Sequence, residues 1–321
     1  MKHLGISGGG TKISGLFGAA EYVMRDRQYQ PEIISGISAG AILSLPMALG
    51  KYDEIKQLVL NLEFDSFFSE SPVSKKGKIR LWNAFSKILN GRYYLGVQKN
   101  LEKTLSTVIS FEEFEAYKTN DKLPICIVGT VDFYTGKRFY FNLKELTYDQ
   151  MLKMVNASAS LPIFTPGVLL KGPIKDFEGE GSKNDQLLLF DGGVRDHSPS
   201  AKVLSSNKYD IKESATIYSR PDDPHDFIDH TSFQPSNLLT ILERYVDITN
   251  NEISKNDELI EQQVMKDKGI KDHGTVFLPR MTQGVYDIDQ ARLKALYQGG
   301  IAAAEAVWSS ELFVWHLANP T

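Results

Sequence analysis

The chain has 321 residues, of which 42% are hydrophobic and 24% are charged, and its net charge is −4. This composition indicates a globular protein that can bury a sizeable core without disulfides or metal clips. The acidic balance excludes a broad nucleic-acid-binding surface. The single cysteine excludes an internal disulfide and fits a reducing compartment.

Targeting signals are not visible in the sequence. No apolar run approaches the roughly 18 residues that span a bilayer. The first residues enter a glycine-rich stretch before a secretory apolar region could form. We therefore expect a cytoplasmic protein, with peripheral membrane association as the alternative to free diffusion.

The first 50 residues predict two strand–turn–helix units. A strand over 3–7 precedes a helix over 16–26, and a second strand over 31–38 precedes a helix that Pro46 kinks or ends. Two strands joined by so short a crossover lie parallel and side by side. Their carboxyl ends then meet at one edge of the sheet, where α/β proteins build their sites.

The remainder of the chain also alternates helices and strands. This pattern predicts a single α/β domain over 1–321, with a helical insertion at 51–118 and a helical C-terminal part at 236–321. The further predicted elements are a loop at 69–78, a hairpin at 123–142, a helix at 148–162, a strand at 186–194, a loop at 220–235, helices at 236–267 and 289–308, and a strand at 274–279.

A serine follows the second predicted strand in the sequence Gly36-Ile37-Ser38-Ala39-Gly40. A tight turn between small residues pushes such a hydroxyl out of the sheet edge, and the amides of the following helix favour a negative charge nearby. Both properties suit a nucleophile. A serine that caps the helix is an equally good interpretation of this motif alone.

The sequence Gly-Gly-Gly-Thr-Lys at 8–12 ends the first predicted strand. Its amides can face the same sheet edge as Ser38, as an oxyanion hole requires, and its lysine adds a positive charge. Two phosphate-binding alternatives fail on the sequence. A P-loop needs lysine directly after the second glycine, and a dinucleotide fingerprint needs glycine where Ile13 stands.

A nucleophilic serine needs a base, and the sequence offers two kinds. Asp191 directly follows an apolar strand and precedes two glycines, although an Asp-Gly turn also ends many ordinary strands. His197 lies six residues further on. His225, His230 and His273 lie in polar loops or beside aspartate and are typical of surface histidines.

Taken together, these motifs resemble the patatin-like phospholipase family. The glycine turn looks like its oxyanion loop, residues 36–40 like its nucleophile elbow, and 191–193 like its Asp-Gly-Gly box. The segment 156–166 is similar to the family's Ala-Ser-x-Ala-x-Pro stretch between elbow and box. Order and spacing agree over nearly the whole chain, with weaker matching in 50–120 and 205–270. Ile13 departs from the glycine usual after the basic residue.

The resemblance implies an α/β, three-layer patatin-like fold with a mainly parallel central sheet flanked by helices. It implies a Ser38–Asp191 dyad that cleaves carboxylic esters with no metal and no organic cofactor, and it leaves His197 as a minor helper at most. The other implied site residues are Gly8, Gly9, Gly10, Thr11 and Lys12 at the oxyanion hole, Gly36 and Gly40 in the elbow, and Gly192 and Gly193 in the box.

The implied substrates are phospholipids, lysophospholipids or related lipid esters. Two alternatives stay open: an esterase or acyltransferase that uses the same dyad on soluble esters, and a catalytically idle or trigger-dependent regulatory module. Bacterial relatives include toxin-like effectors and phospholipases switched on by a second messenger. An unknown activator is therefore a candidate partner, and the polar stretch 220–270 is a candidate place for its control.

Residues 64–94 mix aromatic and basic side chains. This composition suits an anionic membrane surface, so we expect the segment to make peripheral membrane contact or to form a lid over the dyad. The ordinary alternative is that the aromatic side chains face the core and the lysines belong to a solvated loop.

Overall fold

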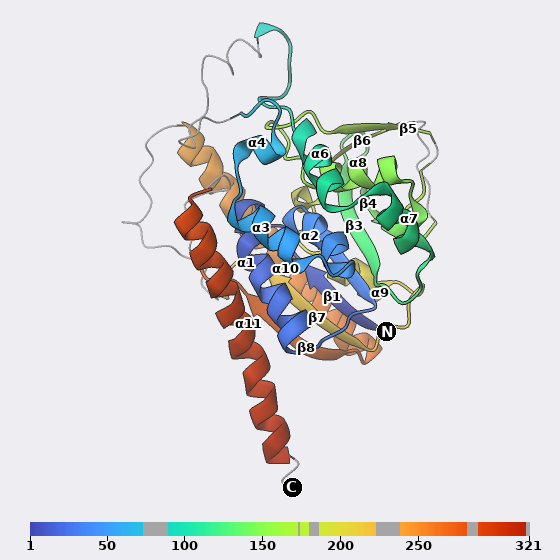
Figure 1. Ribbon diagram of the computed structural model, residues 1–321, viewed down its shortest axis with the longest axis vertical. Helices are drawn as coiled ribbons and strands as arrows, with labels where there is room; N and C mark the ends of the chain where they lie inside the picture. The colour runs from blue at the N-terminus through green and yellow to red at the C-terminus, as the bar shows by residue number, and fades with distance from the viewer. Residues whose placement is uncertain (73–88, 173, 180–185, 223–237, 281–287, 319–321) are drawn as a thin grey trace.

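The computed structural model describes residues 1–72, 89–172, 174–179, 186–222, 238–280 and 288–318. These residues build one eight-stranded sheet in the order β5-β6-β3-β2-β1-β7-β8, with β4 paired to β3 (Figure 1). The strands are β1 (Lys2–Ile6), β2 (Ile33–Ile37), β3 (Ile125–Asp132), β4 (Arg138–Asn142), β5 (Val168–Lys171), β6 (Gln186–Asp191), β7 (Glu213–Tyr218) and β8 (Lys271–Phe277).

Five neighbouring strands, from β3 through β2, β1 and β7 to β8, run parallel. β4 and β6 pair with β3 in the antiparallel sense, and β5 pairs with β6 in the same way. The predictions that the first two strands are parallel neighbours and that the sheet is mainly parallel are both confirmed.

Apolar side chains project from both faces of the sheet and pack against the helices that cover them. Along β2, Ile34 belongs to the larger buried cluster and Ile33 to a second cluster on the opposite face, as the two-residue period of a strand requires. The helices and the sheet thus form three layers. The helices are α1 (Ile13–Glu21), α2 (Ala39–Ala48), α3 (Tyr52–Leu60), α4 (Phe64–Phe67), α6 (Lys99–Val108), α7 (Phe111–Thr119), α8 (Tyr148–Ser158), α9 (Ser200–Ser205), α10 (Leu238–Lys268) and α11 (Gln290–Ala318).

The last helix packs tightly on the first. A Cβ on Gly18 of α1 would lie 2.3 Å from the carbonyl oxygen of Tyr297, and a Cβ on Gly300 of α11 would lie 2.1 Å from that of Gly15. Glycines therefore allow the two helix backbones to touch. Figure 1 shows α11 continuing well past the edge of the sheet, so it is longer than the predicted helix at 289–308.

Several boundaries differ from the predictions. The helix expected at 16–26 starts earlier, as a 3-10 turn at Gly10–Lys12 that leads into α1, and it ends in a π turn at Tyr22–Asp26. α2 continues through Pro46 to Ala48. β5 and β7 were not predicted. The expected loops at 69–78 and 220–235 lie mostly outside the described residues.

Candidate active site

The sheet register brings Ser38 and Asp191 to the same level. Ile37, the last residue of β2, is in register with Gly129 of β3. The next residue of β3, Thr130, is in register with Asp191 of β6. β6 runs antiparallel to β3, and its last residue, Asp191, pairs with Thr130 near the carboxyl end of β3. Ser38 directly follows the carboxyl end of the parallel strand β2. Both residues therefore lie near the carboxyl edge of the parallel strands.

Ser38 sits in a strained turn between β2 and α2. Its φ of 54° and ψ of −116° lie in a region that side-chain-bearing residues rarely adopt, at a cost on the order of 1–3 kcal/mol. A Cβ on Gly36 would lie 2.3 Å from the backbone of Gly40, and a Cβ on Gly40 would lie 2.2 Å from the carbonyl oxygen of Ile6. Neither position of the motif can therefore accept a side chain, because the neighbouring backbone occupies the space.

Ser158, at the end of α8, fixes the backbone of this turn. The Ser38 N–H donates to Ser158 Oγ at 3.0 Å, and the Ser158 hydroxyl donates to the carbonyl oxygen of Gly129 at 2.7 Å. Ser158 thereby ties the turn to β3. Sequence analysis assigned no individual role to Ser158, whose only signal was its place in the segment 156–166.

Hydrogen bonding by the Ser38 side chain lowers the pKa of the Asp191 carboxyl, so the two side chains lie within reach of each other. The carboxyl also accepts the N–H of Gly193 at Oδ1, at 2.8 Å. Asp191 is only 2% exposed. Burial raises the pKa of this carboxyl to about 7, against the smaller opposing effect of the two hydrogen bonds. The group can therefore accept a proton and release it near neutral pH, as a general base must.

The glycine turn lies beside the serine. The Gly8 N–H donates to the carbonyl oxygen of His197 at 2.9 Å, and the Lys12 N–H donates to that of Gly9 at 3.0 Å. Within the described part of the chain, the N–H groups of Gly9 and Gly10 make no hydrogen bond. Gly10 has a φ of 53° and lines a pocket together with Ser38.

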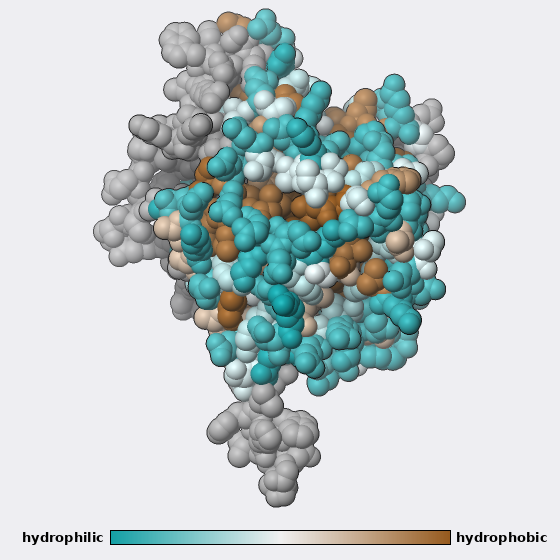
Figure 2. Space-filling view, viewed as in Figure 1, coloured by the Kyte–Doolittle hydropathy of each residue, from teal (hydrophilic) through white to brown (hydrophobic). Residues whose placement is uncertain are grey.

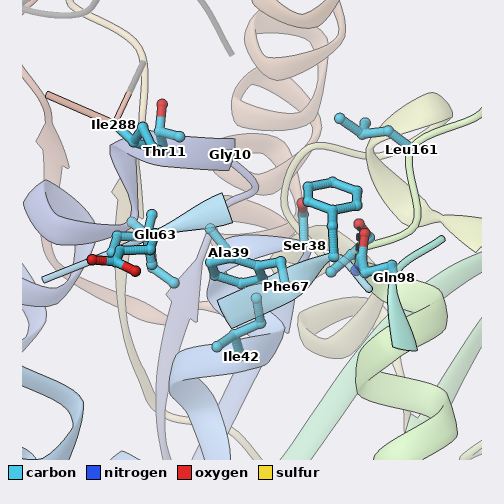
Figure 3. A pocket seen from close by; sticks show the side chains of 14 residues that line it. Gly10, Thr11, Ser38, Ala39, Ile42, Glu63, Phe67, Gln98, Leu161 and Ile288 are labelled. Atoms are coloured by element: carbon cyan, nitrogen blue, oxygen red, sulfur yellow. Dashed lines mark hydrogen bonds between the residues drawn. The ribbon is translucent and has the colours of Figure 1, made fainter. Parts of the chain in front are cut away.

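This pocket is an open hollow of about 600 Å³, a figure that includes open solvent at its mouth, and its lining is mainly apolar. Figure 3 shows Ser38 at its centre, with Gly10 and Thr11 on one side and Gln98 on the other. Figure 2 shows hydrophobic residues in a hollow between α3 and α6 on this side of the molecule. The lining residues are Gly10, Thr11, Ile13, Ser38, Ala39, Ile42, Leu62, Glu63, Phe67, Phe68, Gln98, Ala159, Leu161 and Ile288.

Comparison with known proteins identifies the family. The model of the patatin-like phospholipase family matches residues 4–202, a stretch that includes Ser38, Asp191 and the glycine turn. The chain belongs to the patatin-like phospholipase family. This membership supports lipid acyl hydrolysis as the activity class.

Two individual proteins are similar to this patatin-like chain. Triacylglycerol lipase 5 of Saccharomyces cerevisiae is 27% identical over 210 residues, which cover 62% of this chain and 27% of the yeast protein. The chain therefore matches about a quarter of the length of that relative. The crystal structure of VipD from Legionella pneumophila has a TM-score of 0.43 at 14% identity, covering 96% of this chain and 67% of that one.

In this patatin-like chain Lys12 stands between two lining residues of the pocket, Thr11 and Ile13, and is not itself among the described lining residues. Burial lowers the pKa of its ammonium, with Asp247 raising the pKa and Arg280 lowering it. Its positive charge also acts on His197. Lys12 thus acts on the site through its charge, which reaches His197.

The segment 51–118 supplies much of the pocket wall, including Leu62, Phe67, Phe68 and Gln98. Of the aromatic residues predicted to touch a membrane, Phe68 is buried and Tyr93 is 63% exposed. The basic residues at 75–80 and the residues Trp82, Phe85 and Lys87 lie outside the described residues.

The histidines of the described residues differ in their distance from the dyad. His197 is 6% exposed, and its ring lies beside the dyad. His3 is buried in the sheet between Ser35 and Ser214. His273 Nε2 lies 2.8 Å from Glu213 Oε2 and its side chain is only 14% exposed, so the interpretation of His273 as a surface histidine was wrong. His225 and His230 lie outside the described residues.

The described residues contain no group of three or more His, Cys, Asp or Glu side chains arranged to hold a metal ion. Nor does any helix among them combine the length and apolar character needed to cross a membrane.

Proposed function

We propose that this chain is a serine lipid acyl hydrolase that cleaves carboxylic esters through Ser38 and Asp191. The observation that carries the proposal is a buried carboxylate, Asp191, within reach of the Ser38 side chain, which itself lines a mainly apolar pocket. The geometry supplies a nucleophile, a base of suitable pKa and space for an acyl chain.

In the acylation half-reaction, Ser38 Oγ attacks the ester carbonyl carbon and its proton passes to Asp191. The carbonyl oxygen becomes negative and is stabilised by the N–H groups of Gly9 and Gly10. The tetrahedral intermediate then collapses. The bond to the alcohol oxygen breaks, that oxygen takes the proton from Asp191, and the acyl group stays on Ser38.

In the second half-reaction, water attacks the acyl-enzyme and gives a proton to Asp191. Asp191 returns this proton to Ser38 Oγ as the fatty acid leaves, which restores the starting state. The N-terminus of α2 points its unpaired amides at the same place and favours the negative intermediate in both halves. This chemistry uses no metal or organic cofactor.

The pocket supports a lipid as substrate, because apolar side chains surround the nucleophile and few polar groups interrupt them. The decisive experiment measures fatty acid release from mixed phospholipid vesicles by the wild type and by Ser38→Ala. Release by the wild type alone supports the proposal. Cleavage of a soluble ester without any release from vesicles indicates the non-lipid esterase or acyltransferase.

If neither substrate is cleaved, labelling with a fluorophosphonate probe separates the remaining alternatives. Labelling of the wild type but not of Ser38→Ala indicates a competent dyad that awaits an activator. The absence of labelling at Ser38 indicates a catalytically idle module and contradicts the proposal.

We further propose that the loops at 93–97 and 161–167 contact the lipid surface. The Leu95 N–H donates to the carbonyl oxygen of Ile163 at 2.8 Å, and the Tyr93 hydroxyl donates to that of Pro166 at 3.2 Å. Ile163 is 53% exposed although its φ of 73° is strained for a β-branched residue. Leu161, two residues earlier, lines the pocket, so these exposed side chains lie near its mouth.

Ile163→Asn tests this contact, because asparagine tolerates a positive φ and is polar. The substitution should raise the free energy of unfolding by about 1 kcal/mol. It should lower release from vesicles several-fold and leave hydrolysis of a monomeric soluble ester unchanged. Equal rates for the variant and the wild type on vesicles would remove Ile163 from the lipid-contacting surface.

A further inference from the structure

His197 carries polar atoms that the mechanism above does not use. Its Nδ1 is fully buried and has no hydrogen-bond partner among the described residues. Leaving a buried polar atom unpaired typically costs on the order of 1–3 kcal/mol, so native proteins rarely do so without a functional reason. The other ring nitrogen, Nε2, belongs to the edge of the ring that approaches the dyad, and this position suggests a functional reason.

The opposite edge of the His197 ring faces the dyad. A Cβ built on Gly8 would lie 3.4 Å from Ser38 Cβ, 3.7 Å from His197 Cε1 and 3.8 Å from His197 Nε2. A Cβ built on Gly193 would lie 3.0 Å from Asp191 Oδ1 and 4.0 Å from His197 Cδ2. The edge Cε1–Nε2–Cδ2 therefore extends from the side of Ser38 to the side of Asp191.

The backbone holds the ring in this position from two directions. The His197 carbonyl oxygen accepts the Gly8 N–H at 2.9 Å. The N–H groups of His197 and Ser198 both donate to Asp257 Oδ2 of α10, the latter at 3.1 Å. α10 thus anchors the residue that faces the dyad, although it contributes no lining residue of the pocket among the residues described.

The ring is a neutral hydrogen-bond donor. Burial, together with the positive charges of Lys12 and Arg220, lowers the pKa of His197 to about 3. A neutral imidazole carries one N–H, and buried N–H groups without partners are rarer than unpaired acceptors. The proton therefore belongs on Nε2, the nitrogen that faces the dyad, and the unpaired Nδ1 is the acceptor.

We propose that His197 Nε2–H donates a hydrogen bond to the leaving alcohol oxygen of the ester. This inference rests on the proposed function and adds a catalytic residue to it. The amides of Gly9 and Gly10 serve the carbonyl oxygen, whereas Nε2 belongs to the ring edge that approaches Gly8 and Gly193, the neighbours of Ser38 and Asp191. Asp191 must return its proton to the alcohol. As the carbon–oxygen bond breaks, the alcohol oxygen takes the proton from Asp191, and His197 keeps its own proton throughout.

The test compares two esters of one acyl chain in the same detergent micelles, a p-nitrophenyl ester and a monoacylglycerol. The p-nitrophenolate ion leaves without a proton, but the glycerol oxygen needs one. His197→Leu should lower kcat/KM for the monoacylglycerol roughly 10- to 100-fold and for the p-nitrophenyl ester less than about 3-fold. His197→Gln, whose amide reaches the same position, should recover most of the loss.

His197→Asn serves as a second variant in case the leucine variant does not fold, because its amide is polar but too short to reach. It should behave as the leucine variant does. His273→Gln is the matched control near the beginning of β8, away from the carboxyl edge, and should keep the wild-type ratio between the esters. Ser38→Ala, measured in parallel, establishes that hydrolysis depends on the dyad.

Equal losses on both esters would overturn the inference, since they indicate a residue that only shapes the glycine turn. An unchanged rate on the monoacylglycerol would overturn it as well. If the wild type cleaves neither ester in a Ser38-dependent way, this inference fails, and fluorophosphonate labelling of Ser38 decides whether the proposed function fails with it.

Discussion

Asp191→Asn should abolish ester hydrolysis and yet stabilise the folded protein at alkaline pH. The wild-type carboxyl is buried, and burial raises its pKa from 3.8 to about 7. Asparagine has nearly the same shape and can accept the Gly193 N–H as the carboxylate does, at 2.8 Å in the wild type. It removes the buried charge together with the base, so the two effects should appear in one variant.

The sign follows from proton linkage. Because the folded-state pKa lies above the unfolded one, folded protein holds a proton that the unfolded chain has already released between about pH 4 and pH 7. The contribution of Asp191 to stability is therefore complete below about pH 4 and is lost as pH rises to about 7. Each pKa unit is worth about 1.4 kcal/mol, so the step from about pH 5 to about pH 9 costs the wild type about 3 kcal/mol at this residue.

Denaturant unfolding of wild type and Asp191→Asn at these two pH values measures the effect. Burial also raises the pKa values of Asp257 and Glu261 to about 7, but both groups are present in each protein and cancel in the difference. Ser38→Ala is the control, because it removes a hydrogen bond that lowers the pKa of Asp191 and should keep or steepen the pH dependence.

The refuting result is a constant stability difference. If wild type and Asp191→Asn differ by the same amount, within about 1 kcal/mol, at both pH values, then Asp191 is not a buried charge of raised pKa. A normal carboxylate pKa would also make Asp191 a weaker base for a serine hydroxyl.

Three further outcomes are expected. The kcat/KM of the wild type for a soluble ester should rise with pH through about 7, as the base form of Asp191 appears; a profile that is flat across this range would contradict that role. Ser158→Ala should lower kcat about 10-fold in a folded protein, because the Ser38 N–H loses its acceptor; steady-state rates together with circular dichroism check this. Gly40→Ala should lose more than about 3 kcal/mol of stability or fail to fold, since its Cβ would lie 2.2 Å from the Ile6 carbonyl oxygen; thermal unfolding decides.

The parts of the site that the sequence predicts well are those that local backbone contact dictates. Gly36 and Gly40 can be predicted because a side chain on Gly36 would meet the backbone of Gly40, and a side chain on Gly40 would meet the backbone of β1. Gly192 is readable for the same reason, since a Cβ there would lie 2.8 Å from the carbonyl oxygen of Gly129. A motif of small residues thus indicates that backbones are in contact, and it can be recognised in the sequence before the fold is known.

β7 escaped prediction because its buried polar residues look like those of an exposed segment. Ser214 and Thr216 alternate with apolar residues in a strand that lies between β1 and β8. Inside the fold, Ser214 hydrogen-bonds His3 at 2.9 Å, and Thr216 donates to Glu261 of α10. These partners lie far away in the chain, so composition alone could not show that the polar groups are satisfied.

The pocket wall and the place of His197 depend equally on distant segments. Gln98 and Ile288 line one pocket although 190 positions separate them in the sequence. His197 stands in a polar stretch, Arg-Asp-His-Ser-Pro, which is typical of a surface turn. Its burial results from α10, whose Asp257 accepts the backbone N–H groups of His197 and Ser198.

Several departures from local rules lie around the pocket, and they support the site alongside the motifs. Of the three described non-glycine residues with positive φ, Ser38 lines the pocket and Ile163 follows two residues after Leu161, another lining residue. Asp191 is a buried carboxylate of raised pKa, and His197 has an unpaired buried nitrogen beside it. Each feature alone lowers stability by about 1 kcal/mol or more. Similar features occur elsewhere in the described residues, such as the raised pKa of Glu261. Those around Ser38 coincide with a pocket, as expected where function compensates for a local loss of stability.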